Sequence, residues 1–212
     1  MARTQAKDYH DKRAALLKTS ARLFADEGFE RTSMAQVAKA SGVSKALLYH
    51  YYSGKDELLF DIITGHLTSL IGVTEQAAIE PGPAEHRLHR MVVALLEEYR
   101  DADDEHRVQL SSLGSLPVNQ QRTVLELSRK IVDLFAEAMI SVVPSLKDRP
   151  ELVKPVTMSL FGMLNWHYTW FREDGEMGRE DYARLATRII VEGTRNLDAA
   201  SPQLYLVEPQ QA

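Results

Sequence analysis

Two short runs of apolar residues at helical spacing lie on either side of a glycine in the first quarter of the chain. In the first run, Met34, Val37 and Ala38 fall at i, i+3 and i+4, so one face of a short helix is apolar. Thr32 or Ser33 can cap the start of this helix with its hydroxyl oxygen. The pattern therefore predicts a short helix that begins next to these hydroxyls.

The second run begins just after Gly42, where the chain must reverse. Glycine suits this position because it takes a positive φ at little cost. Ser44 can cap the second helix, and either Leu47 or Leu48 then faces inward. Four other residues stay available on the N-terminal and outer face of this helix: Lys45, Ala46, Tyr49 and His50.

Beyond residue 54, helix breakers divide the chain into long segments with helical periodicity and no obvious strand. The first, Lys55–Glu80, ends at Pro81-Gly82-Pro83 and would connect two parts of the protein. Further helices are predicted at residues 84–100, 105–114, 118–143, 151–172 and 179–197. We therefore predict an all-α protein with an N-terminal three-helix helix-turn-helix domain at residues 1–54, a second helical domain at 55–200 and a tail at 201–212.

Charge is distributed unevenly between these parts. Residues 1–55 hold ten Lys or Arg against five Asp or Glu, a formal balance of +5. The remaining 157 residues carry fifteen basic and twenty-five acidic groups, a balance of −10. Phosphate contacts supply most of the non-specific affinity for DNA, so a basic patch on an otherwise acidic protein orients it on DNA. This favours double-stranded DNA as a partner, with the second short helix in a groove.

Two segments flank the short helices, Leu16–Phe29 and Leu48–Leu58. The first ends in a glycine and an aromatic residue. The second follows the pattern Leu-Tyr-x-His-Phe-x-x-Lys-x-x-Leu, except that Tyr51 stands at the histidine position and Tyr52 at the phenylalanine position. Both segments resemble the TetR family of bacterial transcriptional regulators, in its first helix and in its junction into the fourth helix. The resemblance implies a DNA-binding regulator.

The resemblance also assigns side chains to the DNA. One set is expected to hold the DNA backbone: Ser33, Tyr49, Tyr51 and Lys55. A second set is expected nearest the bases: Ser44, Lys45 and Ala46. His50 is expected in either role. The chemistry agrees with this division, because Lys45 suits the acceptors of guanine and Ala46 suits a thymine methyl group.

The last two long helices carry more apolar surface than one small helical layer buries. A dimer interface is expected at Phe161, Leu164, Tyr168, Phe171, Tyr182, Leu185 and Ile189. Two copies would form a four-helix contact, as the family does, and a two-fold dimer reads a palindromic operator. The alternative is that these residues form intramolecular core.

The TetR family usually encloses a small-molecule pocket in its second domain. Residues 161–171 look like a segment of members that regulate fatty-acid, aromatic-acid or steroid breakdown, some of which respond to acyl-CoA thioesters. An acyl tail would be lined by Met91, Leu95, Val124, Leu127, Gly162, Asn165 and Trp166. A phosphate or carboxylate would meet Arg100, His106 and Arg107. The alternative is that Asn165 and the tryptophans merely pack between helices.

Several other chemistries find no support in the sequence. The chain has no cysteine, which excludes disulfides and thiol catalysis and, with no apolar signal region at the start, favours the cytoplasm. The longest apolar runs are interrupted by His, Glu or Arg, so no membrane span is expected. His86 and His89 share a helical face but lack an obvious third metal ligand. No phosphate loop or nucleophile elbow is present, so neither a cofactor nor an enzyme activity is expected.

Three hypotheses follow. The first is a dimeric, ligand-responsive repressor, in which an effector in the second domain moves the connector helix and lowers DNA affinity. The second is a DNA-binding regulator without a small-molecule effector, controlled by a protein partner. The third is a helical enzyme that has adopted this fold.

Overall fold

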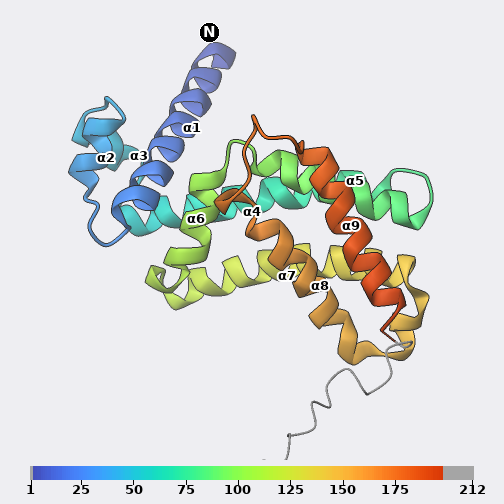
Figure 1. The fold of residues 1–212 in the computed structure, drawn as a ribbon. Coiled ribbons are helices and arrows are strands. Elements are labelled where there is room, and N and C mark those ends of the chain that lie inside the picture. Colours follow the sequence, from blue (N-terminus) through green and yellow to red (C-terminus); the bar gives the residue numbers. More distant parts are fainter. Residues whose placement is uncertain (1, 198–212) are drawn as a thin grey trace, which may run out of the picture. The chain divides into compact units, whose positions relative to one another are not determined.

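The computed structural model describes the backbone of residues 2–197 and the side chains of residues 12–197 (Figure 1). The expected tail at 201–212 lies outside the described residues. Within residues 2–197 the chain forms nine α-helices and three short 3-10 turns, and no strand, which confirms the all-α class. The helices are α1 (Ala2–Glu27), α2 (Met34–Ala40), α3 (Lys45–Tyr51), α4 (Lys55–Ile79), α5 (Ala84–Tyr99), α6 (Asp103–Ser112), α7 (Val118–Val142), α8 (Pro150–Asn165) and α9 (Arg179–Arg195).

The described residues group into two compact units. Residues 2–73 and 98–131 form the first unit, and residues 74–97 and 132–197 form the second. The first unit thus contains α1 to α3, most of α4, α6 and the first half of α7. The domain boundary between residues 54 and 55 stays a prediction, because these units are defined by contacts and each takes part of α4.

In the first unit, α6 packs against α1 through charged side chains. Arg107 on α6 donates to the backbone oxygen of Ala25 at 2.9 Å and to the carboxylate of Asp26 at 3.3 Å. Lys18 and Glu105 form a second ion pair at 3.4 Å. Arg107 was expected to meet an anionic ligand. In the structure its guanidinium fixes α6 to the C-terminal end of α1, where free carbonyls attract a cation, and the contact with a ligand stays a prediction.

A buried group of rings joins α4 and α6 in the same unit. The Tyr99 and His106 ring centroids are 4.5 Å apart, and those of His66 and His106 are 5.8 Å apart. Burial, together with His106 and Lys18, lowers the pKa of His66 to about 3, so its ring is neutral at pH 7. The connector helix α4 thus carries a neutral polar ring inside an apolar core.

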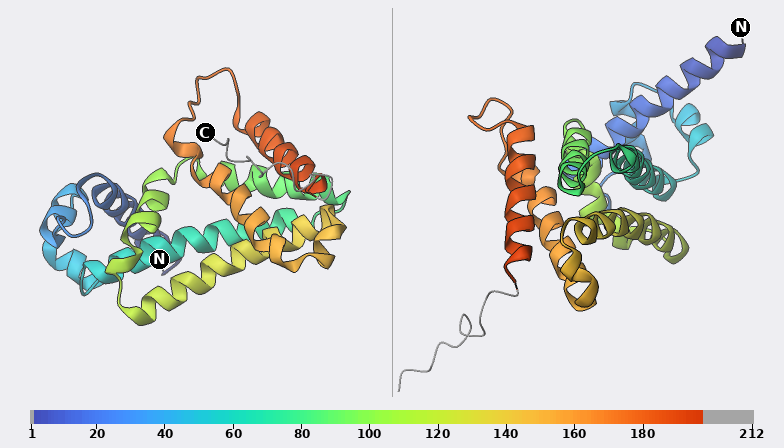
Figure 2. Two further views of the ribbon diagram at one scale, coloured as in Figure 1. Left: turned by 60° about the horizontal axis from the view of Figure 1, so that its bottom comes forward. Right: turned by 90° about the vertical axis from the view of Figure 1, so that its right-hand side faces the viewer.

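The second unit buries part of the expected dimer interface in its own core. Phe135 on α7 and Phe161 on α8 meet edge to face at 5.1 Å. Leu164 is fully buried, and the Tyr182 hydroxyl donates to the backbone oxygen of Met163 at 2.9 Å. Figure 2 shows α8 and α9 side by side. Phe161, Leu164 and Tyr182 are therefore core residues of a single chain, which corrects their expected place in an interface.

Helix α8 is shorter than predicted. It ends at Asn165 instead of residue 172, so Tyr168 and Phe171 leave the helix. The reason is His167, which is buried and stacks on Phe171 with centroids 4.1 Å apart. Arg179 lies over Phe171 and donates to the backbone oxygen of Leu96 at 3.0 Å. This aromatic cluster needs a turn after α8, which apolar spacing alone does not indicate.

Helix α4 bears on the expectation that no segment spans a membrane. By length and composition alone α4 is apolar enough to cross one, with a mean hydropathy of 1.2, a test that the core helix of a globular protein also passes. Half of that stretch is buried inside the protein. Its leucines and isoleucines from Leu58 to Ile71 line the core, as in the central helix of a globular domain.

Candidate nucleic-acid interface

The turn between α2 and α3 is a Schellman motif. Val43 N–H donates to the oxygen of Ala38 at 3.0 Å, and Gly42 N–H donates to the oxygen of Lys39 at 3.2 Å. Gly42 has a φ of +66°, as its position in the sequence predicted. These bonds satisfy the last carbonyls of α2 and set the direction in which α3 begins.

Two serines cap the short helices, which confirms both predicted caps. Ser33 accepts from the backbone N–H of Gln36 at 3.3 Å, and the Gln36 side chain accepts from the Ser33 N–H at 2.8 Å. Ser44 accepts from the N–H of Leu47 at 3.1 Å. Each cap stabilises its helix by about 1 kcal/mol. Both hydroxyls therefore have a structural partner before any DNA is present.

Helix α3 has one anchored face and one open face. Leu48 is fully buried, as one of the two predicted leucines. Tyr49 is 53% exposed, and Lys45, Ala46 and His50 are exposed beside it. Within the described part of the chain, neither Lys45 nor Tyr49 makes a hydrogen bond or an ion pair. Their donors are available to an external partner.

Tyr51 and Tyr52, at the C-terminal end of α3, differ in burial. Tyr51 is half-buried, with its ring 5.9 Å from that of His50. Tyr52 is buried, and its hydroxyl donates to the carboxylate of Asp61 at 2.6 Å. Burial and then this hydrogen bond raise the pKa of Tyr52, so the hydroxyl stays a donor. Arg13 on α1 binds the same carboxylate.

The Asp61 contacts were missed from the sequence. The signal was a carboxylate in the middle of the apolar run at residues 58–63, which the helical pattern places beside the core. A buried or half-buried carboxylate in such a run needs a hydrogen-bond or ion-pair partner. Nothing in the sequence indicates which of the many basic and phenolic side chains is that partner.

Lys55 stands at the start of α4 and is engaged within the chain. Its Nζ donates to the backbone oxygens of Phe29 at 3.0 Å and Glu30 at 3.1 Å. It also lies 4.4 Å from the centre of the Phe29 ring and 3.6 Å from the Glu30 carboxylate. Lys55 therefore fixes the loop between α1 and α2 to α4, and its expected contact with the DNA backbone stays a prediction.

The residues expected around an effector are not all enclosed. Met91, Leu95, Val124 and His106 are buried, whereas Leu127 and Asn165 are half-buried. Arg100 and Gly162 are exposed, and Trp166 is 64% exposed. Gly162 and Trp166 thus lie on the surface of one chain, which corrects their expected place in an enclosed pocket. Apolar spacing on α8 does not indicate which of its faces meets the core.

Several large apolar side chains are exposed on α8, just after it and on α9. Met158 and Trp166 lie eight residues apart on one side of α8, with Gly162 between them. On α9, Leu185 is 41% exposed and Ile189 is 52% exposed. Leu185 and Ile189 were expected at an interface, and Met158 was missed although its i, i+4 spacing to Gly162 was visible. We call Met158, Trp166, Leu185 and Ile189 the α8–α9 apolar face.

A capped helix pair with a Schellman turn, an anchored second helix and an open basic face defines a helix-turn-helix DNA-binding protein. Comparison with known families agrees. Residues 16–62 match the family described as bacterial regulatory proteins, tetR family. Residues 81–194 match the tetracyclin repressor-like, C-terminal domain. The chain belongs to the TetR family of DNA-binding transcriptional regulators, which are not enzymes.

Related proteins span most of the chain. A TetR-family regulator from Bordetella parapertussis has 30% identity and a TM-score of 0.81, over 87% of this chain and 96% of that one. AibR, solved in complex with isovaleryl coenzyme A and operator DNA, has 27% identity and a TM-score of 0.72, over 84% and 97%. The transcriptional repressor KstR2 of Rhodococcus jostii is 22% identical, over 86% of this chain and 90% of its own length.

The turn geometry gives a first prediction. A Cβ added at Gly42 would meet nothing within 4 Å, so Gly42→Ala introduces only the strain of a positive φ. We expect it to lower the free energy of unfolding by about 1 kcal/mol. Urea unfolding of the full chain at one protein concentration measures this.

Gly65→Ala is the matched control. Gly65 lies inside α4, and a Cβ there also meets nothing within 4 Å. Because alanine is the better helix former, this variant should gain about 0.5–1 kcal/mol. A gain of similar size in both variants would show that Gly42 is not held in the left-handed conformation.

Proposed function

We propose that this regulator is a cytoplasmic repressor that binds a palindromic operator as a homodimer and is released by a small hydrophobic or acyl-CoA-type effector. The observation that carries the proposal is the open face of α3. Its anchor Leu48 is buried while Lys45, Ala46 and Tyr49 are exposed and unhindered. A helix held in this way fits the major groove.

The expected roles on DNA follow from this face. Lys45 and Ala46, at the start of α3, would reach base edges, together with the backbone of Ser44. Tyr49, His50 and Tyr51 would lie along the phosphates. Ser33 would contact the phosphates through the backbone N–H groups near its cap. Lys55 would contact them through the third hydrogen of its ammonium group, because its two carbonyl partners accept the other two. The formal +5 of residues 1–55 supplies attraction to the phosphate backbone.

The dimer would use the α8–α9 apolar face. Four large apolar side chains exposed on two adjacent helices are unfavourable in water, and a second copy covers them by two-fold symmetry. Tyr168 and Phe171 lie next to Trp166 in the turn after α8 and are half-buried, so they would lie at the edge of this contact. A dimer places two copies of α3 on two half-sites, which a short recognition helix needs for specificity.

The effector would bind in the core beside α4 and act on this helix. Support comes from AibR, whose complex contains isovaleryl coenzyme A and operator DNA. In this chain the rings of His66, Tyr99 and His106 meet in the core beside α4. A polar effector group bound there would touch α4 and α6, and α6 is tied to α1 through Arg107. The effector lowers DNA affinity only as far as it prefers the conformation that fits DNA less well.

A pair of α3 variants tests the DNA contact. We expect Lys45→Ala to weaken binding to a site selected from a random duplex library by about tenfold or more, since a base contact contributes 1–3 kcal/mol. Tyr49→Phe should weaken binding to the selected duplex and to random duplexes by the same factor, which is smaller than that of Lys45→Ala, because a backbone contact carries no sequence information. Fluorescence polarisation at fixed salt measures both.

Lys147→Ala is the control for Lys45→Ala. It removes the same charge from an exposed position in the second unit. It should leave both affinities unchanged apart from a small effect of net charge. Equal losses for Lys147→Ala and Lys45→Ala would contradict a specific role for α3.

The interface is tested by Ile189→Glu. A carboxylate in the centre of the α8–α9 apolar face should prevent association, because the charge would lose its water in the contact. Light scattering should then give the chain mass of 23.9 kDa in place of twice that value. Leu110→Glu, at a 52% exposed leucine of α6, is the control and should stay dimeric. A wild-type chain that is monomeric, or an Ile189→Glu variant that stays dimeric, contradicts this interface.

The effector is tested with isovaleryl coenzyme A against free coenzyme A. We expect the thioester to release labelled operator in a mobility-shift assay and free coenzyme A to have little effect. His106→Phe, which keeps a ring but removes its polar atoms, should retain DNA binding and lose the response. If a series of acyl-CoA esters and free acids leaves DNA affinity unchanged, control by a protein partner becomes the better hypothesis.

A further inference from the structure

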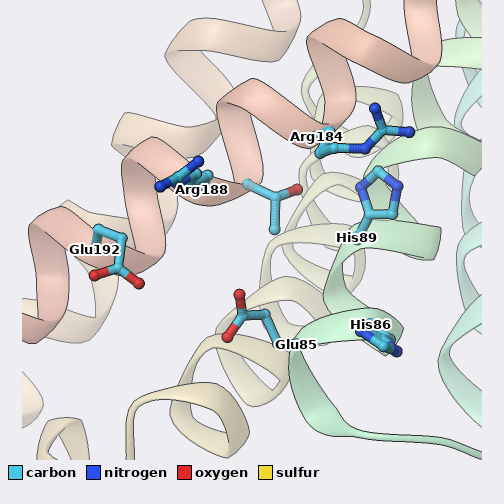
Figure 3. Close-up of a pocket in the computed structure, with 7 residues that line it drawn as sticks. Glu85, His86, His89, Arg184, Arg188 and Glu192 are labelled. Atoms are coloured by element: carbon cyan, nitrogen blue, oxygen red, sulfur yellow. The ribbon is translucent and has the colours of Figure 1, made fainter.

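A hollow of about 310 Å³ opens between α5 and α9 in the second unit, and none of the residues that line it was expected at the effector or on DNA (Figure 3). This volume lies at the small end of the range for ligand pockets. The side chains around it are polar or charged. They are Glu85, His86 and His89 of α5, and Arg184, Thr187, Arg188 and Glu192 of α9.

Thr187 supplies an unused hydroxyl to this hollow. The residue is 4% exposed, and its Oγ1 is buried without a hydrogen-bond partner among the described residues. Two other buried helical threonines donate to the carbonyl four residues earlier, Thr157 at 2.8 Å and Thr194 at 2.6 Å, whereas the hydroxyl of buried Thr74 in α4, like that of Thr187, has no partner among the described residues. For Thr187 that carbonyl belongs to Ala183, and the backbone of Ala183 already bonds the imidazole of His89.

His89 supplies an acceptor. One ring nitrogen bonds the backbone of Ala183, while Nδ1 is buried without a partner among the described residues. Burial and then the charge of Arg184 lower the pKa of His89, so the ring is neutral at pH 7. A neutral imidazole that donates through one nitrogen accepts through the other. The lone pair of the buried Nδ1 thus has no donor among the described residues.

Arg188 supplies a cation. Its guanidinium is exposed and forms no ion pair in the part of the chain that the structure describes. Its neighbour Arg184 differs, because it is held by Asp181 at 2.9 Å and Glu180 at 3.3 Å. Figure 3 shows Arg184 and Arg188 on the α9 side of the hollow, with Glu85 and His89 opposite on α5.

The two acids of the lining are balanced by one shared cation outside it. Arg195 binds Glu85 and Glu192, each at 2.8 Å. The pair keeps a residual negative charge beside the hollow, which disfavours a dianion such as phosphate. A ligand with a single negative charge and a hydrogen-bond donor fits better.

We propose that this hollow binds a small carboxylate that carries a hydroxyl or ammonium group on the neighbouring carbon. The carboxylate accepts from Arg188 and from the Thr187 hydroxyl, which satisfies the unused donor. The neighbouring donor bonds Nδ1 of His89. The occupant is therefore an α-hydroxy or α-amino acid, bound by α5 and α9 together.

The hollow and the α8–α9 apolar face are neighbours on α9. Arg188 lies three residues after Leu185, and Glu192 lies three residues after Ile189, so these side chains border the apolar face. A small acid in the hollow is a second input to the protein, separate from the core effector.

The experiment is thermal unfolding of the full chain with sodium salts of L-lactate, L-serine, acetate or phosphate, each against sodium chloride of equal ionic strength. A ligand that binds only the folded protein raises its Tm. We expect lactate or serine to raise the Tm by about 2–5 °C, acetate less and phosphate not at all. Each variant is compared with its own ligand-free Tm.

Thr187→Val keeps the shape of the side chain and removes the hydroxyl, and Arg188→Gln removes the cation. Both should abolish the shift. Thr157→Val and Arg172→Gln, at a buried threonine of α8 and an exposed arginine outside the hollow, should retain it. No shift with lactate or serine, a shift with phosphate alone, or an undiminished shift in Thr187→Val overturns the proposal. None of these outcomes depends on DNA binding.

Discussion

The carboxylate of Asp61 is the interaction on which the DNA-binding surface depends. It sits on α4 and receives the Tyr52 hydroxyl at 2.6 Å and the guanidinium of Arg13 from α1. The residue that ends α3 is thereby bonded to the two longer helices beneath it. A short hydrogen bond to a carboxylate is among the stronger ones, and a partly exposed ion pair adds roughly 1 kcal/mol. Beside it, α3 is held by the buried Leu48 and by the turn from α2.

Lys55 and Arg107 extend this network. Lys55 binds the loop between α1 and α2 to the first turn of α4, and Arg107 binds α6 to the last turn of α1. Both place a cation against backbone carbonyls and add a carboxylate, Glu30 for Lys55 and Asp26 for Arg107. The helix-turn-helix, α4 and α6 consequently form one compact unit, and a displacement of α6 or α4 reaches α3 through hydrogen bonds. This is the physical basis for regulation in the proposed function.

The sequence predicted the local structure well at positions where a particular residue type is required by the backbone geometry. Gly42 and the capping serines follow from backbone chemistry, and Leu48 follows from helical spacing. Prediction failed where partners are distant in the chain. Asp61 with Tyr52 and Arg13, and Lys55 with the Phe29 carbonyl, are tertiary contacts that no local pattern encodes. The same limit applies to α8, whose early end depends on His167 packing against Phe171 and on Arg179 from the next helix.

Apolar spacing also left open which face of α8 and α9 is inside. Phe161 and Leu164 are buried on α8 while Trp166, directly after its end, is exposed, and Phe161 packs against Phe135 of α7. The polar hollow between α5 and α9 was equally invisible, because its unused hydroxyl results from a carbonyl occupied by a residue about a hundred positions away. Function at the DNA surface was more predictable than function in the second unit, since the helix-turn-helix is defined within about 30 consecutive residues.

The central claim is that α3 enters the DNA groove with Ala46 next to the bases, and the absence of cysteine allows a direct measurement. A cysteine introduced by Ala46→Cys and labelled with an iron-EDTA reagent would cut DNA only where α3 lies. We expect two clusters of cuts in the selected site, separated by about one helical turn or a multiple of it. The same label at Lys147→Cys should give no localised cuts. Cuts spread evenly along the DNA, or cuts from Lys147→Cys alone, would contradict the claim.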